Sequence, residues 1–475
     1  MSQTKLFLLT AILIAGSILT ASAQLVRPAD FHEKYTLTQT VVLSRHNIRS
    51  PLSTGESLLG RITPHQWFEW SSAPSELSLR GGVLETMMGQ FFRKWLVSEG
   101  LMSENELPAE GTMRFYANSM QRTIATAQYF SSGLLPVANV DIEHHYAMGT
   151  MDPVFTPQLT VVSDEYRERS LKQIADLFGG GTIEGIGEKM AGELALIESV
   201  IDIQDSQACQ LSGLCSFNTG DVQIALEQFK EPSMTGGLKT ATSVSDALVL
   251  QYYEETDDAK AAFGHTLTMD DWARISAVKD WYGDVLFTAP LIAVNVAHPL
   301  LQEILSELRQ EGRVFSFLCG HDSNIGSVLA ALGVEDYTLP GAVEAKTPIG
   351  SKLVVEKWHG QDGSDYVALN LCYQSVDQLR HLPLLSLQNP PMVCSLQFEG
   401  LTANSDGLYP LADFEQHMAE RIARYDDLLT NIPGTAVSPS SSDRVYRIDG
   451  TPSDKNTRGI VIEDGQKRIS TATSR

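Results

Sequence analysis

The fold is decided by one stretch of the chain, which reads Thr40-Val41-Val42-Leu43-Ser44-Arg45-His46-Asn47-Ile48-Arg49-Ser50-Pro51. Its first four residues form a continuous run typical of a strand that is buried on both faces. The run then breaks abruptly, and Arg45, His46 and Arg49 leave the end of the strand. In open α/β sheets the crevice outside the carboxyl ends of the strands is where ligands bind. We therefore expect these three side chains to belong to a ligand site.

Two later segments repeat this pattern of a strand followed by charged or imidazole side chains. A strand from Met113 to Tyr116 runs toward Arg122, and a strand from Val314 to Cys319 opens into His321 and Asp322. If the three strands are neighbours, their ends bring four or five positive or donor groups to one point. An acidic protein that gathers its arginines in this way is expected to bind an anion there.

Helices are expected between these strands. Apolar residues at helical spacing predict a helix from about Val83 to Val97, and Gly333 is a predicted end for the short helix that follows His321. Strands that alternate with helices predict an α/β fold with a mostly parallel central sheet flanked by helices.

The sequence changes character between about Thr150 and Asp284, where strand-like runs nearly vanish and helical periods take their place. We interpret residues 150–284 as an all-α domain inserted into an α/β core made of residues 24–149 and 285–435. Residues 436–475 form a polar tail. Within it, Val445–Ile448 and Ile460–Ile462 predict a small hairpin, with Asp464-Gly465 as a turn.

Residues 1–23 have the features of a secretory signal peptide. Lys5 precedes an apolar run from Leu6 to Leu19, and small residues follow at Ala21 and Ala23. A membrane anchor is the alternative interpretation, but the run is shorter than the roughly 20 apolar residues that a spanning helix needs. We therefore expect the mature chain to be exported to the periplasm with no membrane segment.

The charge balance limits the classes of partner. The 475 residues include 35 Lys and Arg against 58 Asp and Glu, a formal net charge of -23. This balance argues against a general nucleic-acid binder and against adhesion to anionic lipid, since both need a basic surface. The expected partner is a small molecule, and the oligomeric state is left open.

Cysteine usage fits export. Cys209 and Cys215 lie six positions apart in a polar stretch and suit a small disulfide-closed loop. Cys372 and Cys394 lie in strand-like sequence and are able to pair only if their strands are neighbours. Cys319 ends an apolar run and is predicted to be buried and unpaired.

The best fit for the expected anion is a phosphoryl group. Arginine binds phosphate oxygens through two parallel hydrogen bonds and stays charged at any working pH. Arginines around His46 should lower the pKa of that side chain and leave a neutral imidazole able to attack phosphorus. Asp322 offers a carboxyl group that can protonate a departing oxygen. Phosphoryl transfer mostly needs positioning and charge neutralisation, so no metal or other cofactor is expected.

Each of these features has a simpler interpretation when it is taken alone. An isolated Arg-His pair is common, a His-Asp pair after a strand can be a helix cap, and Arg122 can be part of a surface ion pair. The conjunction is more specific: a strand followed by Arg-His-x-x-Arg-x-Pro and, much later, a strand followed by Gly-His-Asp.

At this point the sequence resembles the histidine acid phosphatase family, in the branch of phytases and periplasmic glucose-1-phosphatases, most closely the latter. The resemblance covers roughly Tyr35 to Phe414. The family signature Arg-His-Gly-x-Arg-x-Pro and its distant His-Asp are present here as Arg45 to Pro51 and His321-Asp322. Further similar stretches are Ala117-Asn118-Ser119 with Gln121-Arg122-Thr123, Met148 to Pro153, Leu250 to Glu254, Gly320 to Ile325, and Thr347 to Gly350.

The resemblance implies a role for each site residue. It implies that His46 is the nucleophile that becomes phosphohistidine and that Asp322 is the proton donor to the leaving group. It implies that the phosphoryl oxygens bind to four further side chains, which are Arg45, Arg49, Arg122 and His321.

The sequence departs from the family pattern at several positions. Asn47 replaces the commoner glycine and matches the glucose-1-phosphatase variant. Leu401 and Leu408 stand where two family cysteines are expected, which puts one family disulfide in doubt, whereas the Cys209–Cys215 loop is retained.

The leading hypothesis is an exported acid phosphomonoesterase that hydrolyses sugar phosphates such as glucose 1-phosphate through a phosphohistidine. A phytase that hydrolyses inositol hexakisphosphate, or a sugar phosphotransferase, is the alternative, and a non-catalytic periplasmic phosphate-binding protein comes third. Glu231 is a candidate at the rim of the substrate site, where its carboxylate would disfavour highly phosphorylated substrates; a solvated loop residue is the simpler interpretation. His144 and His145 are adjacent, point to opposite faces of a strand, and are interpreted as structural rather than metal-binding.

Overall fold

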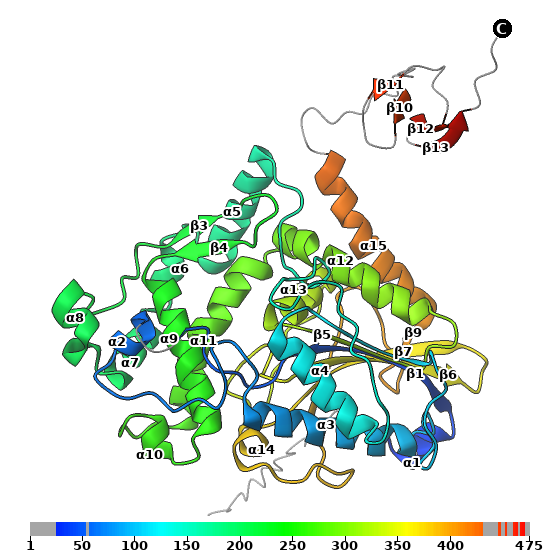
Figure 1. Cartoon of the computed structure of the whole chain (residues 1–475), viewed down its shortest axis with the longest axis horizontal. Helices are drawn as coiled ribbons and strands as arrows, with labels where there is room; N and C mark the ends of the chain where they lie inside the picture. Colours follow the sequence, from blue (N-terminus) through cyan, green and yellow to red (C-terminus); the bar gives the residue numbers. More distant parts are fainter. Residues whose placement is uncertain are drawn as a thin grey trace, which may run out of the picture. The chain divides into compact units, whose positions relative to one another are not determined.

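The computed structural model describes residues 25–53, 57–430 and four short strands between residues 445 and 470 (Figure 1). The predicted signal peptide lies outside the described residues. The main sheet has the strand order β2-β5-β1-β6-β7-β8, and β9 also pairs with β7. Its strands are β1 (Tyr35–Arg45), β2 (Met113–Ala117), β5 (Phe315–Gly320), β6 (Lys352–Gly360), β7 (Asp365–Tyr373), β8 (Met392–Ser395) and β9 (Tyr409–Pro410).

The three strands singled out from the sequence are neighbours in this sheet. β5 lies between β1 and β2 and is parallel to both, with Arg45 opposite Gly320 and Ala117 opposite Cys319. The remaining pairs are antiparallel, so the sheet is mixed around a parallel core. The antiparallel half follows from chain length, since only residues 361–364 separate β6 from β7 and so short a connection cannot form a parallel crossover.

Helices cover both faces of the sheet, as the α/β prediction requires (Figure 1). One face is packed by α3 (Leu79–Ser98) and α4 (Gln121–Leu134), with Trp95 and Phe130 fully buried. The other face is packed by α12 (Pro290–Arg309), α13 (Asp322–Leu332) and α15 (Leu411–Thr430). The predicted helix of residues 83–97 is confirmed as α3, which begins four residues earlier because the Ser78 hydroxyl accepts a hydrogen bond from the Gly81 N–H.

Short helices complete this part of the fold, namely α1 (Ala29–His32) and α14 (Val376–His381). Gly333 ends α13 in the left-handed conformation (φ 69°), as predicted for a C-terminal glycine.

The segment predicted to be helical contains most of the remaining helices (Figure 1). They are α5 (Asp164–Phe178), α6 (Gly185–Glu188), α7 (Ala191–Val200), the 3-10 helix η1 (Ile203–Asp205), α8 (Gln207–Ser212), α9 (Gly237–Glu254), α10 (Asp258–Ala261) and α11 (Met269–Phe287). The helix α2 (Leu58–Arg61), from an earlier part of the chain, lies beside α8 (Figure 1). The segment also holds a two-stranded sheet of β3 (Gln223–Ala225) and β4 (Ser233–Thr235), which the all-α prediction did not include because three-residue strands leave too short a pattern.

The structure confirms the predictions for Cys209, Cys215 and Cys319, and it settles whether Cys372 and Cys394 pair. Cys209 and Cys215 form a disulfide, and Cys319 is buried and unpaired. Cys372 and Cys394 do not pair, although β7 and β8 are neighbours. Cys372 is opposite Val393 and Cys394 is opposite Leu371, so the two thiols point to opposite faces of the sheet.

The chain from Asp426 onward forms a second compact unit. Its described strands are β10 (Val445–Arg447), β11 (Pro452–Ser453), β12 (Gly459–Glu463) and β13 (Gln466–Ser470). β10 pairs with β12 in antiparallel fashion, as the predicted hairpin requires, and β12 also pairs with β13 in antiparallel fashion. The predicted turn at Asp464-Gly465 lies outside the described residues.

Among the described residues no single helix has the length and apolar character needed to cross a membrane. α11 and α12 reach that threshold only when they are taken as a pair, and the pair is bent by 85°.

Candidate active site

The site forms where the parallel strands β1, β5 and β2 end side by side. His46 follows β1, His321 and Asp322 follow β5, and Arg122 lies in the first turn of α4 after β2. The backbone fixes this edge: the His46 N–H donates to the Gly320 carbonyl at 3.1 Å, and the Gly350 N–H donates to the His46 carbonyl at 3.1 Å. The convergence expected from the sequence is therefore present.

His46 is buried and held in one tautomer. Its Nδ1 is 2.9 Å from the carbonyl oxygen of Asn47. Because a carbonyl can only accept, Nδ1 carries the proton and Nε2 keeps its lone pair. Burial, followed by the charge of Arg122 and the electrostatic influence of His321, Arg49 and Arg45, holds the pKa of His46 well below its usual range. The imidazole is therefore neutral, with a nucleophilic lone pair on Nε2.

Arg45 is the most enclosed of the three arginines, with 1% of its surface exposed. Its guanidinium donates from Nη1 to Glu344 Oε1 and to the Thr347 carbonyl, both at 2.5 Å. The Tyr253 hydroxyl donates to the other oxygen of Glu344 at 3.0 Å. These contacts aim the remaining guanidinium nitrogens at the strand ends, where Nη2 lies 3.5 Å from Asp322 Oδ2.

His321 and Arg122 each place an N–H donor close to the other. The Asn118 Oδ1 accepts from the Asp152 N–H at 2.8 Å, so the Asn118 amide group faces His321 Nε2 at 2.7 Å. The Nδ1 of His321 then carries the proton and lies 3.4 Å from Arg122 Nη2. Two N–H donors this close are suited to binding one anionic oxygen together.

The electrostatic state of this pair favours the same conclusion. Burial and the charge of Arg122 keep the pKa of His321 well below its usual range, so this imidazole is neutral as well. Burial and the charge of Arg49 lower the pKa of Arg122 to about 10, which still leaves Arg122 charged near neutral pH. An incoming anion would relieve both effects.

Asp322 is the acidic group at the mouth of the site, with 40% of its side chain exposed. Burial acts to raise the pKa of Asp322, but the opposing charges of Lys279 and Arg45 outweigh it and hold this pKa well below the usual range. Lys279 Nζ lies 3.1 Å from Asp322 Oδ2 and 3.5 Å from Glu344 Oε1. The ligand-free site thus holds Asp322 as a carboxylate.

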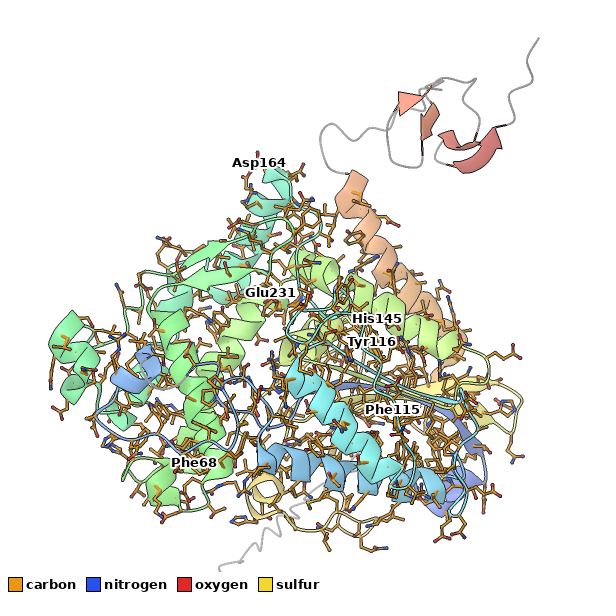
Figure 2. All side chains as sticks on the ribbon, viewed as in Figure 1. Phe68, Phe115, Tyr116, His145, Asp164 and Glu231 are labelled. Atoms are coloured by element: carbon orange, nitrogen blue, oxygen red, sulfur yellow. A yellow bond between two sulfur atoms is a disulfide. The ribbon has the colours of Figure 1, made fainter. Side chains whose placement is uncertain are left out.

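A cavity of about 360 Å³ opens over these groups and is lined by His46, Arg49, Arg122, His321 and Asp322. The helical segment contributes to its lining from α9 and α11. Arg49 Nη2 is held by Asp246 of α9, with 3.0 Å between the guanidinium and the carboxylate. Glu231 also lines the cavity, and Figure 2 shows its label between the helical segment and the part that contains the sheet.

A buried network fixes the residue that follows His46. Asn47 Nδ2 donates to Glu85 Oε1 at 2.7 Å, and Lys352 Nζ lies 3.0 Å from both oxygens of Glu85. Gly350 has φ 67°, and a Cβ atom there would lie 2.4 Å from Asn47 Nδ2. Asn47 therefore needs glycine at position 350, and in return the network holds the carbonyl group that orients His46.

Comparison with known proteins agrees with this arrangement. The profile of the histidine phosphatase superfamily (branch 2) matches residues 36–169 and 205–371. The chain belongs to this superfamily branch. The chain is therefore a phosphatase of the histidine type, as the resemblance in the sequence indicated.

Two glucose-1-phosphatases are similar to this histidine phosphatase over nearly their whole lengths. The Salmonella typhimurium protein is 36% identical over 86% of this chain and 98% of its own length. The Providencia rettgeri protein is 35% identical over 86% of this chain and 97% of its own length. Among solved structures, Hafnia alvei phytase has a TM-score of 0.74 at 27% identity and covers 83% of this chain and 98% of its own.

Sequence reasoning missed several residues of this histidine phosphatase site. Lys279 and Asp246 lie on helices of the inserted segment, and Glu344 lies in a loop, so no strand-end pattern marks any of them. Their contacts with Asp322, Arg49 and Arg45 are visible only in three dimensions.

The adjacent histidines at positions 144 and 145 are tied into local contacts. His145 Nε2 lies 2.7 Å from Glu143 Oε1, and His145 Nδ1 lies 3.1 Å from the Tyr116 hydroxyl. Figure 2 labels His145 and Tyr116 next to each other. His144 Nδ1 lies 3.1 Å from the Tyr146 carbonyl oxygen. Neither histidine lies in a strand, so the predicted strand at these residues is wrong. Their contacts nevertheless fit the structural interpretation.

Proposed function

We propose that the chain is an exported acid phosphomonoesterase that hydrolyses sugar phosphates such as glucose 1-phosphate through a phosphohistidine on His46. The observation that carries the proposal is the state of His46, a neutral imidazole whose Nδ1 donates to the Asn47 carbonyl and whose Nε2 keeps its lone pair while the nearby arginines lower its pKa. The similarity to two glucose-1-phosphatases supports the choice of substrate.

In the first step, Nε2 of His46 attacks phosphorus and a nitrogen–phosphorus bond forms. The bond between phosphorus and the leaving oxygen breaks, and Asp322 in its protonated form gives that oxygen a proton. Arg45, Arg49 and Arg122 bind the three remaining phosphoryl oxygens, with help from the Nδ1–H of His321. The products of this step are the free alcohol and a phosphorylated His46.

In the second step, water attacks the phosphohistidine. The Asp322 carboxylate takes the proton from the water, an oxygen–phosphorus bond forms and the nitrogen–phosphorus bond breaks. Inorganic phosphate leaves, and His46 is again neutral with its proton on Nδ1. Asp322 is again protonated, so the proton balance closes over the two steps.

Proton donation requires that bound substrate change the state of Asp322. In the ligand-free site, Lys279 and Arg45 hold the pKa of Asp322 low. A phosphate dianion neutralises part of that positive charge and adds negative charge beside the carboxylate, and both effects raise the pKa. Protonation of Asp322 is therefore coupled to substrate binding, and this coupling favours turnover in acid.

Substrate choice would depend on the residues that the helical segment adds to the cavity. Asp246 and Glu231 place carboxylates near the arginines, and we infer that they disfavour a substrate with several phosphate groups. The phytase reading remains a second candidate, because the Hafnia alvei phytase shares the fold over 83% of the chain. Export is inferred from the signal-peptide features of residues 1–23.

A substrate panel tests the proposal. Purified protein would be assayed with glucose 1-phosphate, inositol hexakisphosphate and an aryl phosphate at acid pH, and free glucose, phosphate and any new sugar phosphate would be measured. We expect glucose 1-phosphate to have the highest kcat/KM, with one phosphate released per glucose. A higher kcat/KM for inositol hexakisphosphate would assign the phytase reading, and formation of new sugar phosphates would assign the phosphotransferase reading.

A further inference from the structure

Outside the active site, three side chains of types that bind metals meet near the surface of the helical segment. They are His65, Asp202 and His265, whose ligand atoms all lie within 4.8 Å of one another. Asp202 Oδ2 is 2.7 Å from His65 Nε2 and 3.2 Å from His265 Nε2. The three side chains are 31%, 38% and 33% exposed, so solvent reaches the cluster.

The three residues come from segments that are far apart in the sequence. His65 follows α2, Asp202 lies between α7 and η1, and His265 lies between α10 and α11. This dispersion explains why spacing along the chain gives no metal motif. Asp202 lies in none of the residues that the family profile matches, because the two matched ranges leave out residues 170–204.

The local backbone and an aromatic ring hold the cluster in place. Asp202 has φ 47° and ψ 50°, a left-handed conformation uncommon for a residue other than glycine. The ring of His65 stacks on Phe263, with 5.0 Å between centroids and 11° between planes. Phe263 lies two residues before His265, so this contact fixes one ligand against the segment that supplies another.

The separations suit a first-row divalent metal ion. Zn²⁺ prefers imidazole nitrogen and carboxylate oxygen at about 2.0–2.2 Å, and a tetrahedron of that size puts neighbouring ligand atoms about 3.3 Å apart. The two distances to Asp202 Oδ2 lie within about 0.6 Å of this value. Side-chain rotation over a few tenths of an ångström would open the ligand triangle to fit the ion.

We propose that His65, Asp202 and His265 form a binding site for a divalent transition metal ion, with Zn²⁺ as the ligand to test. Both histidines would ligate through Nε2 with the proton on Nδ1, Asp202 would ligate through its carboxylate, and water would fill the exposed fourth position. In the metal-free protein the two Nε2 atoms share the single oxygen Asp202 Oδ2, which a metal ion would replace as their common partner.

Such an ion would connect the segment after α2 to the helical segment. The Trp67 Nε1–H donates to the Leu59 carbonyl at 2.9 Å, and Leu59 lines the active-site cavity. The metal would therefore stabilise one wall of the cavity without touching the reacting atoms. Metal binding at this cluster would depend neither on the proposed substrate nor on the phosphohistidine mechanism.

Metal binding to the tag-free full chain tests the proposal. Chelator-treated protein would be titrated with ZnCl₂ by calorimetry, and bound metal would be counted by mass spectrometry after dialysis. We expect one equivalent of Zn²⁺ per chain and a Tm rise of about 3 °C at a hundredfold excess over Kd. Absence of stoichiometric binding would overturn the proposal.

Variants locate the ion. Asp202→Asn is the conservative change, because asparagine tolerates the left-handed conformation and still accepts a hydrogen bond. We expect Asp202→Asn and His265→Ala each to weaken Zn²⁺ binding by at least about 100-fold, while metal-free melts report whether the variants fold. His359→Ala is the matched control, because His359 Nδ1 lies 2.7 Å from Asp365 Oδ1 in a similar histidine–aspartate pair, with the two side chains 53% and 41% exposed. Unchanged affinity in Asp202→Asn and His265→Ala would place the ion elsewhere and overturn the proposal.

Discussion

His46 owes its reactive state to two separate causes. The Asn47 carbonyl fixes the proton on Nδ1, and burial together with neighbouring cationic groups disfavours a second proton on Nε2. An exposed histidine with a pKa near 6.5 would be almost wholly protonated at pH 5 and would lose its nucleophilic lone pair. In this site the lone pair survives at acid pH, which is where Asp322 is most easily protonated.

The pH dependence of catalysis should report the depressed pKa of His46. A histidine whose pKa is lowered stays neutral as the pH falls through 6.5, and it becomes protonated only at a lower pH. We therefore expect the acid limb of kcat/KM for an aryl phosphate to fall well below pH 6.5, in a profile measured from pH 3 to pH 8. An acid limb with an apparent pKa of about 6.5 would show that His46 is not shielded in the proposed way.

The rate loss on removal of Asp322 should be largest for substrates whose leaving group most needs a proton. In Asp322→Asn the donor is lost, and we expect kcat/KM for glucose 1-phosphate, which reports the steps up to release of the leaving group, to fall by about 10²–10⁴-fold. A nitrophenyl phosphate, whose leaving group needs little protonation, should lose much less. Equal losses of kcat/KM for the two substrates at pH 5 would show that Asp322 acts on binding or folding rather than on the leaving oxygen.

At the scale of the elements, the loop after β1 depends on a charge pair buried between α3 and β6. Glu85 and Lys352 are both fully buried and hold Asn47, whose carbonyl in turn orients His46. Burial raises the pKa of Glu85, and the charge of Lys352 opposes this rise. Removal of the lysine would leave a buried carboxylate without its counter-charge.

Lys352→Met should destabilise the protein in a pH-dependent way. We expect a loss of about 3–5 kcal/mol in the free energy of unfolding at pH 7. The loss should shrink as the pH falls to 5, because an unpaired Glu85 with a raised pKa takes up a proton and becomes neutral. Denaturant unfolding at both pH values measures the effect.

Lys172→Met is the control for that measurement, since Lys172 pairs with Asp176 at the surface, where the two side chains are 73% and 53% exposed. It should cost less than about 1 kcal/mol at either pH. A Lys352→Met loss that is as small, or that is the same at pH 5 and pH 7, would contradict this account of the network.

Elements were predictable from the sequence where one residue pattern dominated. The apolar run before Arg45 and the run before His321 predicted β1 and β5, and their strand ends predicted a shared site. The mixed sheet was not predicted, because the apolar patterns of β6 and β7 are the same in either strand direction; only the short connection of residues 361–364 requires the two strands to be antiparallel. The sheet faces to which Cys372 and Cys394 point depend on the register between β7 and β8, and a single sequence does not determine that register.

At the scale of the whole molecule, an acidic chain with a net charge of -23 encloses a small cationic site. The arginines of that site were predictable because they follow strands. Lys279, Asp246 and the cluster of His65, Asp202 and His265 were not, because each depends on how the helical segment packs. The boundaries of residues 150–284 as a separate domain stay a prediction.

A variant of Glu231 tests whether the helical segment contributes to substrate choice. In Glu231→Gln one negative charge is removed from the cavity lining, and we expect the ratio of kcat/KM for inositol hexakisphosphate to that for glucose 1-phosphate to rise by about tenfold. Glu227→Gln is the matched control, because Glu227 pairs with Lys230 at the surface. An equal rise in both variants would show that the effect comes from the net charge of the protein and not from the position of Glu231.

The central claim is that His46 is phosphorylated during turnover, and trapping of the intermediate tests it most directly. Protein mixed with a ³²P-labelled phosphomonoester would be quenched in alkali within milliseconds to seconds, and the labelled peptide would be sequenced. We predict acid-labile, alkali-stable label on His46, at up to one equivalent per chain, and none in His46→Ala. Label on another residue, or full hydrolysis by His46→Ala, would contradict the account.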